Sequence, residues 1–273
     1  MNHLPAVEIY SIGTELLMGQ IQDTNAYWMA QQIAGLGGYV RRIGILDDEL
    51  DEVVGVLGDA CRRQARIIIT SGGLGPTPDD LTVEAVSRLL GVEIETDEAL
   101  VQSFMEKRQI ARREDLNPGL LKMATRPAGA VAHPNPAGVA PCVESRVPSD
   151  GGETVIYNIP GPPREVQAVF AAYIEGPLAE LYSGTRASVR VAVNLPESAC
   201  GPILHRVMQA KPHTYLKALV SLSHKTDDGQ RLPVDVVARA DSHEEAEALL
   251  AETLAMFREA AGEAGSAVYE EEG

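Results

Sequence analysis

Cysteine is scarce in this chain of 273 residues, which contains only Cys61, Cys142 and Cys200. The three lie far apart and no Cys-x-x-Cys pair occurs, so neither a disulfide framework nor a zinc ribbon is predicted. The six histidines form no His-x-x-x-His pair, and isolated histidines are more often packing or surface residues than zinc ligands. The composition therefore suits a reducing compartment and gives no sign of a zinc enzyme.

Long apolar runs and positive charge are also lacking. No run approaches the roughly 18 residues needed to cross a bilayer, and no basic segment followed by a hydrophobic one opens the sequence. Acidic residues number 39 against 23 basic ones, which gives a formal net charge of −16. Such a charge opposes general binding to nucleic acid or to an anionic membrane. We therefore expect a cytoplasmic protein with a small-molecule ligand and no nucleic-acid or membrane partner.

Strand and helix signals alternate regularly along the first part of the chain. Apolar periodicity predicts strands at 6–12, 39–46 and 66–70, with helices at 24–36 and 49–64 between them. Asp23 or Thr24 is available to cap the first helix. This order predicts right-handed crossovers and a three-layer, mostly parallel α/β sheet. Ligands of such sheets bind beyond the carboxyl ends of the strands, where the loops 13–25, 47–49 and 71–80 leave the sheet.

The pattern continues to about residue 181 and then changes. We expect a helix at 81–90, a charged helical region at 97–113, short strands at 129–132 and 139–143, and a strand at 154–158. Pro163 suits the first turn of a helix that reaches about Leu181, since that position has no intrahelical N–H bond to lose. The length favours about two domains, and the change in pattern places them at 1–183 and 184–273.

The second domain is predicted to be a small α+β unit of βαββαβ order. Its strands are expected at 188–193, 214–221, 233–238 and near 267–268, and its helices at 197–209 and 242–261. A hairpin turn is expected at 226–229, between the two middle strands. The only Gly-x-x-G of this second domain, at 262–265, lies in an acidic segment, which argues against RNA binding.

The segment from Thr70 to Thr82, Thr-Ser-Gly-Gly-Leu-Gly-Pro-Thr-Pro-Asp-Asp-Leu-Thr, indicates a phosphate site. Gly72, Gly73 and Gly75 can take positive φ and allow a ligand close to the backbone. The helix expected after the loop adds the positive end of its dipole to the loop N–H groups. These features predict that an anion binds between the strand and the helix.

Two carboxylates, Asp79 and Asp80, end this glycine-rich segment. In the simplest interpretation they only cap the following helix, but one acid is enough for a cap. Hard divalent cations favour grouped carboxylates beside phosphates. The pair therefore remains a candidate metal site, with helix capping as the alternative.

Four motifs together resemble the N-terminal part of the CinA (competence/damage-inducible protein A) family. They are Ile12-Gly13-Thr14-Glu15-Leu16-Leu17-Met18-Gly19-Gln20-Ile21, Asp23-Thr24-Asn25, the segment from Gly72 to Thr82, and Pro160-Gly161-Pro162-Pro163. The resemblance implies a molybdopterin-binding fold, of the MoaB/MogA type found in molybdenum-cofactor biosynthesis proteins, over residues 6–182. It also implies a KH-like domain over 187–270. Many members continue into a nicotinamide-nucleotide amidase domain where this sequence stops, so we expect no deamidase activity.

This resemblance implies a metal-dependent hydrolase of a nucleoside diphosphate compound, with ADP-ribose as the favoured substrate and AMP and ribose 5-phosphate as products. Asp48, Asp79 and Asp80 are then the candidate catalytic and metal-binding residues, for Mg²⁺, Mn²⁺ or Co²⁺, with potassium as a candidate further cation. A homo-oligomer is expected, with a dimer favoured. The candidate substrate-binding residues are Gly13, Glu15, Asn25, Ser71, Gly72, Gly73, Gly75, Thr77, Pro160 and Gly161.

Several alternatives stay open. Glu15 and Asn25 are equally suited to capping or bracing their loop, and Pro160-Gly161 to a simple strand-to-helix connection. Where family members usually have Gly-Thr-Ala-Pro-Gly, this chain has Gly138-Val139-Ala140-Pro141-Cys142. Nucleotidyl transfer in molybdopterin metabolism and a non-catalytic binding module are the other functional classes. Leu74, in place of the threonine of the molybdopterin enzymes, favours hydrolysis over nucleotidyl transfer.

Overall fold

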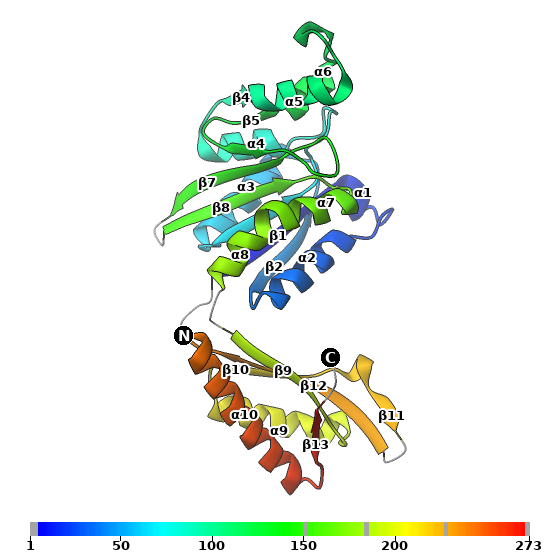
Figure 1. Ribbon diagram of the computed structural model, residues 1–273, viewed down its shortest axis with the longest axis vertical. Helices are drawn as coiled ribbons and strands as arrows, with labels where there is room; N and C mark the ends of the chain where they lie inside the picture. Colours follow the sequence, from blue (N-terminus) through cyan, green and yellow to red (C-terminus); the bar gives the residue numbers. More distant parts are fainter. Residues whose placement is uncertain (1–4, 150–151, 183–185, 227–228, 271–273) are drawn as a thin grey trace. The chain divides into compact units, whose positions relative to one another are not determined.

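The computed structural model describes residues 5–149, 152–182, 186–226 and 229–270 (Figure 1). The chain divides into two compact units, Met1–Leu181 and Tyr182–Gly273. This division lies beside the domain boundary expected at residue 183. Each unit has its own hydrophobic core.

A six-stranded sheet forms the centre of the first unit, in the order β2-β1-β3-β8-β7-β6. β1, β2, β3 and β8 are parallel, whereas β7 and β6 run antiparallel to their neighbours. The predicted three-layer, mostly parallel sheet is therefore confirmed. Its strands are β1 (Ala6–Ile12), β2 (Tyr39–Leu46), β3 (Ile67–Ser71), β6 (Val131–His133), β7 (Cys142–Ser149) and β8 (Gly152–Ile159).

Helices cover both faces of this sheet (Figure 1). α3 (Leu50–Arg62) and α4 (Thr82–Leu90) pack together on one face, where Leu57, Ile68 and Val86 belong to one buried cluster. On the other face, α2 (Thr24–Gly35) packs against β1, β2 and α7 (Pro163–Val169). Strands buried along their whole length, such as β1 and β3, are typical of parallel sheets covered on both faces.

The helix predicted from Pro163 to Leu181 is confirmed as one continuous helical segment. It consists of α7, a π-helical stretch η2 (Phe170–Ile174) and α8 (Glu175–Leu181). Pro163 occupies the first helical turn, as expected. Trp28 and Phe170 make a T-shaped contact with ring centroids 5.3 Å apart, which joins α2 to this segment.

A small substructure connects α4 to β6. It contains β4 (Ile94–Thr96), α5 (Glu98–Arg108), η1 (Arg113–Asp115), α6 (Pro118–Met123) and β5 (Thr125–Pro127). Leu100, Phe104 and Leu120 contribute to a separate apolar cluster here. The pairing of β4 with β5 and the one-turn helix α1 (Thr14–Leu17) were not predicted. Elements of three or four residues are too short to show a period in the sequence.

The second unit has an antiparallel sheet in the order β10-β12-β9-β13. The predicted βαββαβ order is present, with a short β11 pairing with β12 in addition. The strand expected at 214–221 ends at Ala218, and η3 follows it; residues 227–228 of the predicted hairpin turn lie outside the described residues. The elements are β9 (Arg186–Val193), α9 (Glu197–Ala210), β10 (Thr214–Ala218), η3 (Val220–Leu222), β11 (His224–Thr226), β12 (Gly229–Arg239), α10 (His243–Glu263) and β13 (Val268–Glu270).

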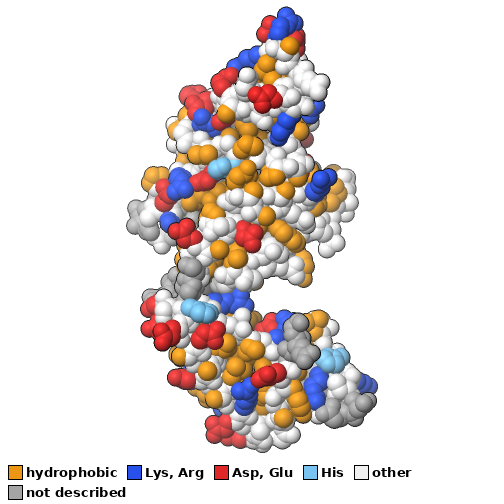
Figure 2. Space-filling view, in the orientation of Figure 1, with side chains coloured by type: hydrophobic (Ala, Val, Ile, Leu, Met, Phe, Trp, Pro, Cys, Tyr) orange, Lys and Arg blue, Asp and Glu red, His pale blue; other side chains and the backbone are white. Residues whose placement is uncertain are grey.

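Charged side chains of both signs are interspersed with hydrophobic ones on the face of each unit seen in Figure 2. The three cysteines are free, as expected. Within the described ranges, no helix is long and apolar enough to cross a membrane.

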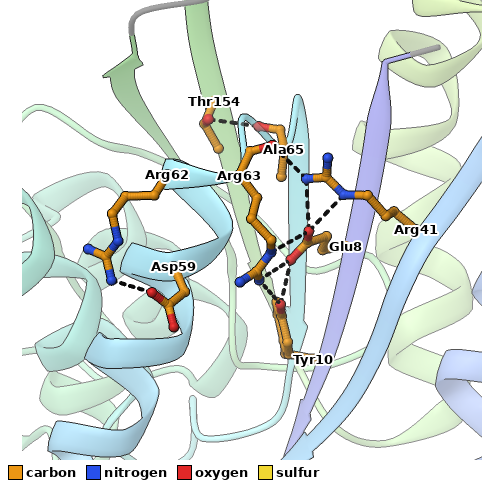
Figure 3. Close-up of polar contacts among 8 residues, drawn as sticks. All are labelled: Glu8, Tyr10, Arg41, Asp59, Arg62, Arg63, Ala65 and Thr154. Carbon is orange, nitrogen blue, oxygen red and sulfur yellow. Dashed lines mark hydrogen bonds and ion pairs between the residues drawn. The ribbon is translucent and has the colours of Figure 1, made fainter. Parts of the chain in front are cut away.

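A buried carboxylate, Glu8, marks the amino ends of the strands in the first unit (Figure 3). Arg41 from β2 and Arg63 after α3 both donate to it, at 2.9 and 2.6 Å, and the Tyr10 hydroxyl donates at 2.5 Å. Burial alone would raise the pKa of Glu8, but these hydrogen bonds outweigh it and lower the pKa to about 2. The cluster ties together β1, β2 and the end of α3 at the edge of the sheet remote from the candidate site.

Candidate functional site

A pocket of about 630 Å³ opens at the carboxyl ends of the parallel strands. Its walls come from the three predicted loops, from the segment after β8 and from the loop before β7, all within the first unit. Every candidate site residue from the sequence lines it except Thr77. The position agrees with the rule that open α/β sheets bind ligands beyond their strand carboxyl ends.

The glycine-rich loop takes a conformation that side chains would prevent. Gly72 has φ +108° and Gly73 has φ +66°. A Cβ at Gly72 would lie 2.2 Å from the Ile12 carbonyl oxygen, and one at Gly73 would lie 2.2 Å from Thr82 Oγ1. Gly75, in contrast, is not among the described residues with positive φ; a Cβ there would lie 2.6 Å from Asp80 Oδ2 and would displace that carboxylate.

Backbone N–H groups of this loop remain available to a ligand. Within the described residues, the N–H groups of Gly73, Leu74 and Gly75 donate no hydrogen bond. α4 follows the loop, and its N-cap residue, Leu81, makes no side-chain cap. The loop therefore offers free donors next to the positive end of a helix dipole, which suits an anion.

Asp80 does not cap α4, so the capping alternative is wrong for this residue. Its Oδ2 accepts hydrogen bonds from the Thr77 backbone N–H at 2.8 Å and from the Thr77 hydroxyl at 2.6 Å. These bonds close the turn from Thr77 to Asp80. No hydrogen bond engages Oδ1 within the described part of the chain, so this oxygen is available to a ligand or a cation.

Asp48 is held in the same way on the other side of the loop. Its Oδ2 accepts from the Thr14 backbone N–H at 2.8 Å and from the Thr14 hydroxyl at 3.1 Å. The Thr14 hydroxyl also contacts Asp47. One carboxylate oxygen of Asp48 thus fixes the start of α1, while the side chain lines the pocket.

Asp79 lines the pocket beside Asp80 and is exposed to solvent. The neighbouring Thr77 hydroxyl holds the pKa of Asp79 below its usual range, and the positive charge of Lys122 adds to this effect. Lys122, on α6, also donates to the Thr77 carbonyl oxygen. The substructure after α4 therefore anchors the turn that carries both carboxylates.

Asn25 braces the loops around the pocket. Its Nδ2 donates to the Gly161 carbonyl oxygen at 2.7 Å and to Ser71 Oγ at 3.4 Å, and Ser71 donates to the Pro160 carbonyl oxygen at 3.1 Å. These contacts support the bracing alternative for Asn25. Glu15, in contrast, lines the pocket with its carboxylate close to the Gly13 backbone.

Sequence reasoning missed one wall of the pocket. Gly138, Val139 and Ala140, in the loop before β7, line it together with Glu165 on α7. The antiparallel β7 begins at the same edge where β8 ends, and this reversal could not be inferred from the βαβ pattern. The position of Glu165, two residues after Pro160-Gly161-Pro162-Pro163, was the available signal.

The residues fit a divalent cation that is shared with a phosphate ligand. Within the described residues, no three His, Cys, Asp or Glu side chains gather into a metal site of their own. Asp48 and Asp80 nevertheless each keep one carboxylate oxygen without a hydrogen bond, and Mg²⁺ is commonly held by one or two carboxylates plus substrate phosphates. The pocket lining contains no lysine or arginine among the described residues, so nothing else there carries a full positive charge.

Comparisons with known proteins agree with this fold. Residues 8–180 match a family described as a probable molybdopterin binding domain. A CinA structure from Thermoplasma acidophilum is 32% identical, covers 64% of this chain and 98% of its own, and superposes with a TM-score of 0.57. The chain belongs to the CinA family.

Relatives extend the similarity beyond the first unit. A protein of Pyrobaculum arsenaticum is 38% identical over 247 residues, 89% of each chain. A CinA-like protein of Kosmotoga olearia is 31% identical over 258 residues, which are 94% of this chain and 59% of that protein. The second unit is therefore part of what this chain shares with its relatives.

Proposed function

We propose that this pocket binds a nucleoside diphosphate compound and hydrolyses its pyrophosphate bond with the help of a divalent cation. ADP-ribose is the favoured substrate, and the products are AMP and ribose 5-phosphate. One combination of features carries the proposal. The backbone N–H groups of Gly73, Leu74 and Gly75 are free. The carboxylates of Asp48 and Asp80 line the same pocket. Together they supply an anion cradle and ligands for a hard cation.

In this proposal the glycine-rich loop holds the pyrophosphate, and the carboxylates act on the cation and the water. Water adds to one phosphorus atom while the bridging P–O bond breaks, and the leaving phosphate takes the electron pair. A bound divalent cation neutralises charge on the phosphate oxygens. Asp48 and Asp80 would hold that cation through their free oxygens, and the Thr77 and Thr14 contacts keep both side chains in place. The proton that the attacking water loses would pass to solvent, to which the pocket opens.

Isosteric replacement of the carboxylates tests the proposal. Asp80→Asn and Asp48→Asn keep an oxygen for the Thr77 and Thr14 hydrogen bonds but lose the negative charge. We expect each to reduce kcat for ADP-ribose hydrolysis by roughly 100-fold or more, with little change in thermal stability. Asp51→Asn is the matched control, because Asp51 pairs with Arg88 on the surface and does not line the pocket. Near-normal turnover of both pocket variants at saturating Mg²⁺ would refute the assignment.

Molybdopterin binding is a second candidate function, because the family model that matches residues 8–180 describes a probable molybdopterin binding domain. Nucleotidyl transfer would then replace hydrolysis, and a binding module without catalysis is the third class. Incubation with ADP-ribose and, separately, with ATP plus molybdopterin, followed by mass spectrometry of the products, separates the three. Cytoplasmic location, a homodimer and a potassium requirement remain predictions.

A further inference from the structure

Glu165 places a carboxylate in the pocket on the side away from Asp48. Asp48 follows β2 and Glu165 follows β8, and β1 and β3 lie between these two strands in the sheet. The glycine-rich loop follows β3, so it lies between the two carboxylates along the edge of the sheet. A ligand whose phosphates occupy that loop would extend one of its substituents towards Glu165.

The Glu165 side chain is fixed by Asn135. Asn135 is only 3% exposed, and its Nδ2 donates to Glu165 Oε2 at 2.6 Å and to the Ala140 carbonyl oxygen at 2.9 Å. Its Oδ1 accepts from the Ala137 backbone N–H at 2.9 Å. Both amide protons and the carbonyl oxygen of Asn135 are thus used within the protein. Asn135 is therefore a positioning residue for Glu165 and for the loop beside it.

The backbone of the loop before β7 approaches the Glu165 carboxylate closely at Gly138. A Cβ at Gly138 would lie 2.0 Å from Glu165 Oε2, so a side chain there would push the carboxylate away. Glu165 Oε1 has no hydrogen-bond partner, and Glu165 has no cationic partner, among the residues that the structure describes. An anchored carboxylate that lines a pocket with an oxygen unpaired is suited to accept hydrogen bonds from a ligand.

The residues around Glu165 limit which kind of ligand group can bind to its carboxylate. The same wall is formed by Val139, Ala140 and Pro160–Pro163, which offer no positive charge. Another anion would be repelled by Glu165, whereas an uncharged group with O–H donors would gain charge-assisted hydrogen bonds. A carboxylate that accepts from ribose hydroxyls is a recurrent solution in nucleotide sites. Neighbouring strands are about 4.8 Å apart, a spacing comparable to one sugar unit.

We propose that Glu165 determines specificity by accepting hydrogen bonds from the ribose hydroxyls of the phosphorylated ligand, with Asn135 holding it in position. This inference rests on the proposed function, because the phosphates must occupy the glycine-rich loop. The wall that carries Glu165 then selects a sugar with free hydroxyls rather than its deoxy form.

Calorimetric titration with hydroxyl and deoxy pairs tests the assignment. The pairs are AMP against its 2′-deoxy and 3′-deoxy forms, and ribose 5-phosphate against 2-deoxyribose 5-phosphate, all with Mg²⁺. We expect the native protein to prefer the hydroxyl form of at least one pair by roughly 10-fold. Glu165→Gln, which still accepts from Asn135, should lose most of that preference, with a smaller effect on the deoxy ligand.

Glu175→Gln is the matched control, because Glu175 begins α8 on the same helical segment but is exposed and lies outside the pocket lining. The inference is overturned if the native protein shows no preference in any pair, or if Glu165→Gln retains it. Should the preference depend on Glu165 while ADP-ribose is not hydrolysed, only the proposed reaction fails. Should ADP-ribose be hydrolysed while the preference survives in Glu165→Gln, only this inference fails.

Discussion

At the scale of single residues, neighbouring glycines of the phosphate loop have different tasks. The sequence predicted the loop and its glycines, but it could not distinguish a backbone requirement from a contact requirement. Gly73 has positive φ and no space for a Cβ, whereas Gly75 only needs to leave room for the Asp80 carboxylate. That distinction depends on Thr82 and Asp80, whose side-chain positions follow from the folded loop.

Replacement by alanine should therefore mainly affect stability at Gly73 and mainly affect kcat at Gly75. Gly73→Ala should lower the free energy of unfolding by about 2 kcal/mol, since it combines a strained φ with a clash against Thr82 Oγ1. Gly75→Ala should change stability by less than about 1 kcal/mol but displace the Asp80 carboxylate and lower kcat. Urea unfolding and ADP-ribose hydrolysis measure the two effects. A stable, inactive Gly73→Ala protein would contradict this division of roles.

The contribution of Glu8 to the stability of the protein depends on pH. Its folded pKa of about 2 lies below the ordinary value of 4.5, so its stabilising contribution is complete above about pH 4.5 and is lost as the pH falls towards 2. Glu8→Gln should destabilise the protein by about 2 kcal/mol at pH 7, less than the roughly 3–5 kcal/mol of fully buried pairs, because both arginines are partly exposed.

Urea unfolding of the native protein and Glu8→Gln at several pH values measures this effect. The difference in stability between the two should shrink from pH 4.5 downwards. The control is Glu252→Gln, whose exposed pair with Lys211 should contribute little. A difference that stays constant down to pH 2 would show that the charge of Glu8 is not what stabilises the cluster.

At the scale of elements, local signals located the long segments well and the short ones poorly. The buried runs of β1 and β3 and the helical spacing of α4 were sufficient to place them. β4, β5 and α1 have three or four residues each, and they form because neighbouring elements supply hydrogen-bond partners. The wall containing Glu165 was missed for the same reason: it depends on the antiparallel pairing of β7 with β8.

The cap of α2 joins helix stability to pocket shape. Asp23 Oδ1 accepts from the Ala26 N–H at 3.0 Å, and Oδ2 accepts from the Ser11 hydroxyl at 2.7 Å. Asp23→Ala should lower the free energy of unfolding by about 1 kcal/mol and raise KM for ADP-ribose, because Asn25 lies in the first turn of the same helix. Asp97→Ala removes a comparable cap from α5 and should leave KM unchanged. If Asp23→Ala and Asp97→Ala have equal KM values, the cap of α2 does not influence the shape of the pocket.

At the scale of the whole molecule, charge was predictable from the sequence, but its arrangement was not. The formal net charge of −16 is at odds with an anionic ligand, and the loop N–H groups and the α4 dipole offer only partial positive charge in compensation. The structure sharpens this conflict, because Glu15, Asp48, Asp79, Asp80 and Glu165 all line the pocket. Neutralisation by a divalent cation is therefore the central requirement of the proposed function.

Removing divalent cations with a chelator should weaken ADP-ribose binding by at least about 10-fold, whereas binding of the uncharged nucleoside adenosine should change little. Added monovalent salt should partly restore binding to the chelated protein, because it shortens the range over which the acidic protein repels the ligand. In the presence of Mg²⁺ the same salt should not strengthen binding. Titration calorimetry of both ligands, with and without chelator at two ionic strengths, measures all of these effects. If the chelated protein binds ADP-ribose as tightly as the Mg²⁺-loaded form, Asp48 and Asp80 do not hold a cation against the phosphates, and a non-catalytic binding module becomes the better description of this pocket.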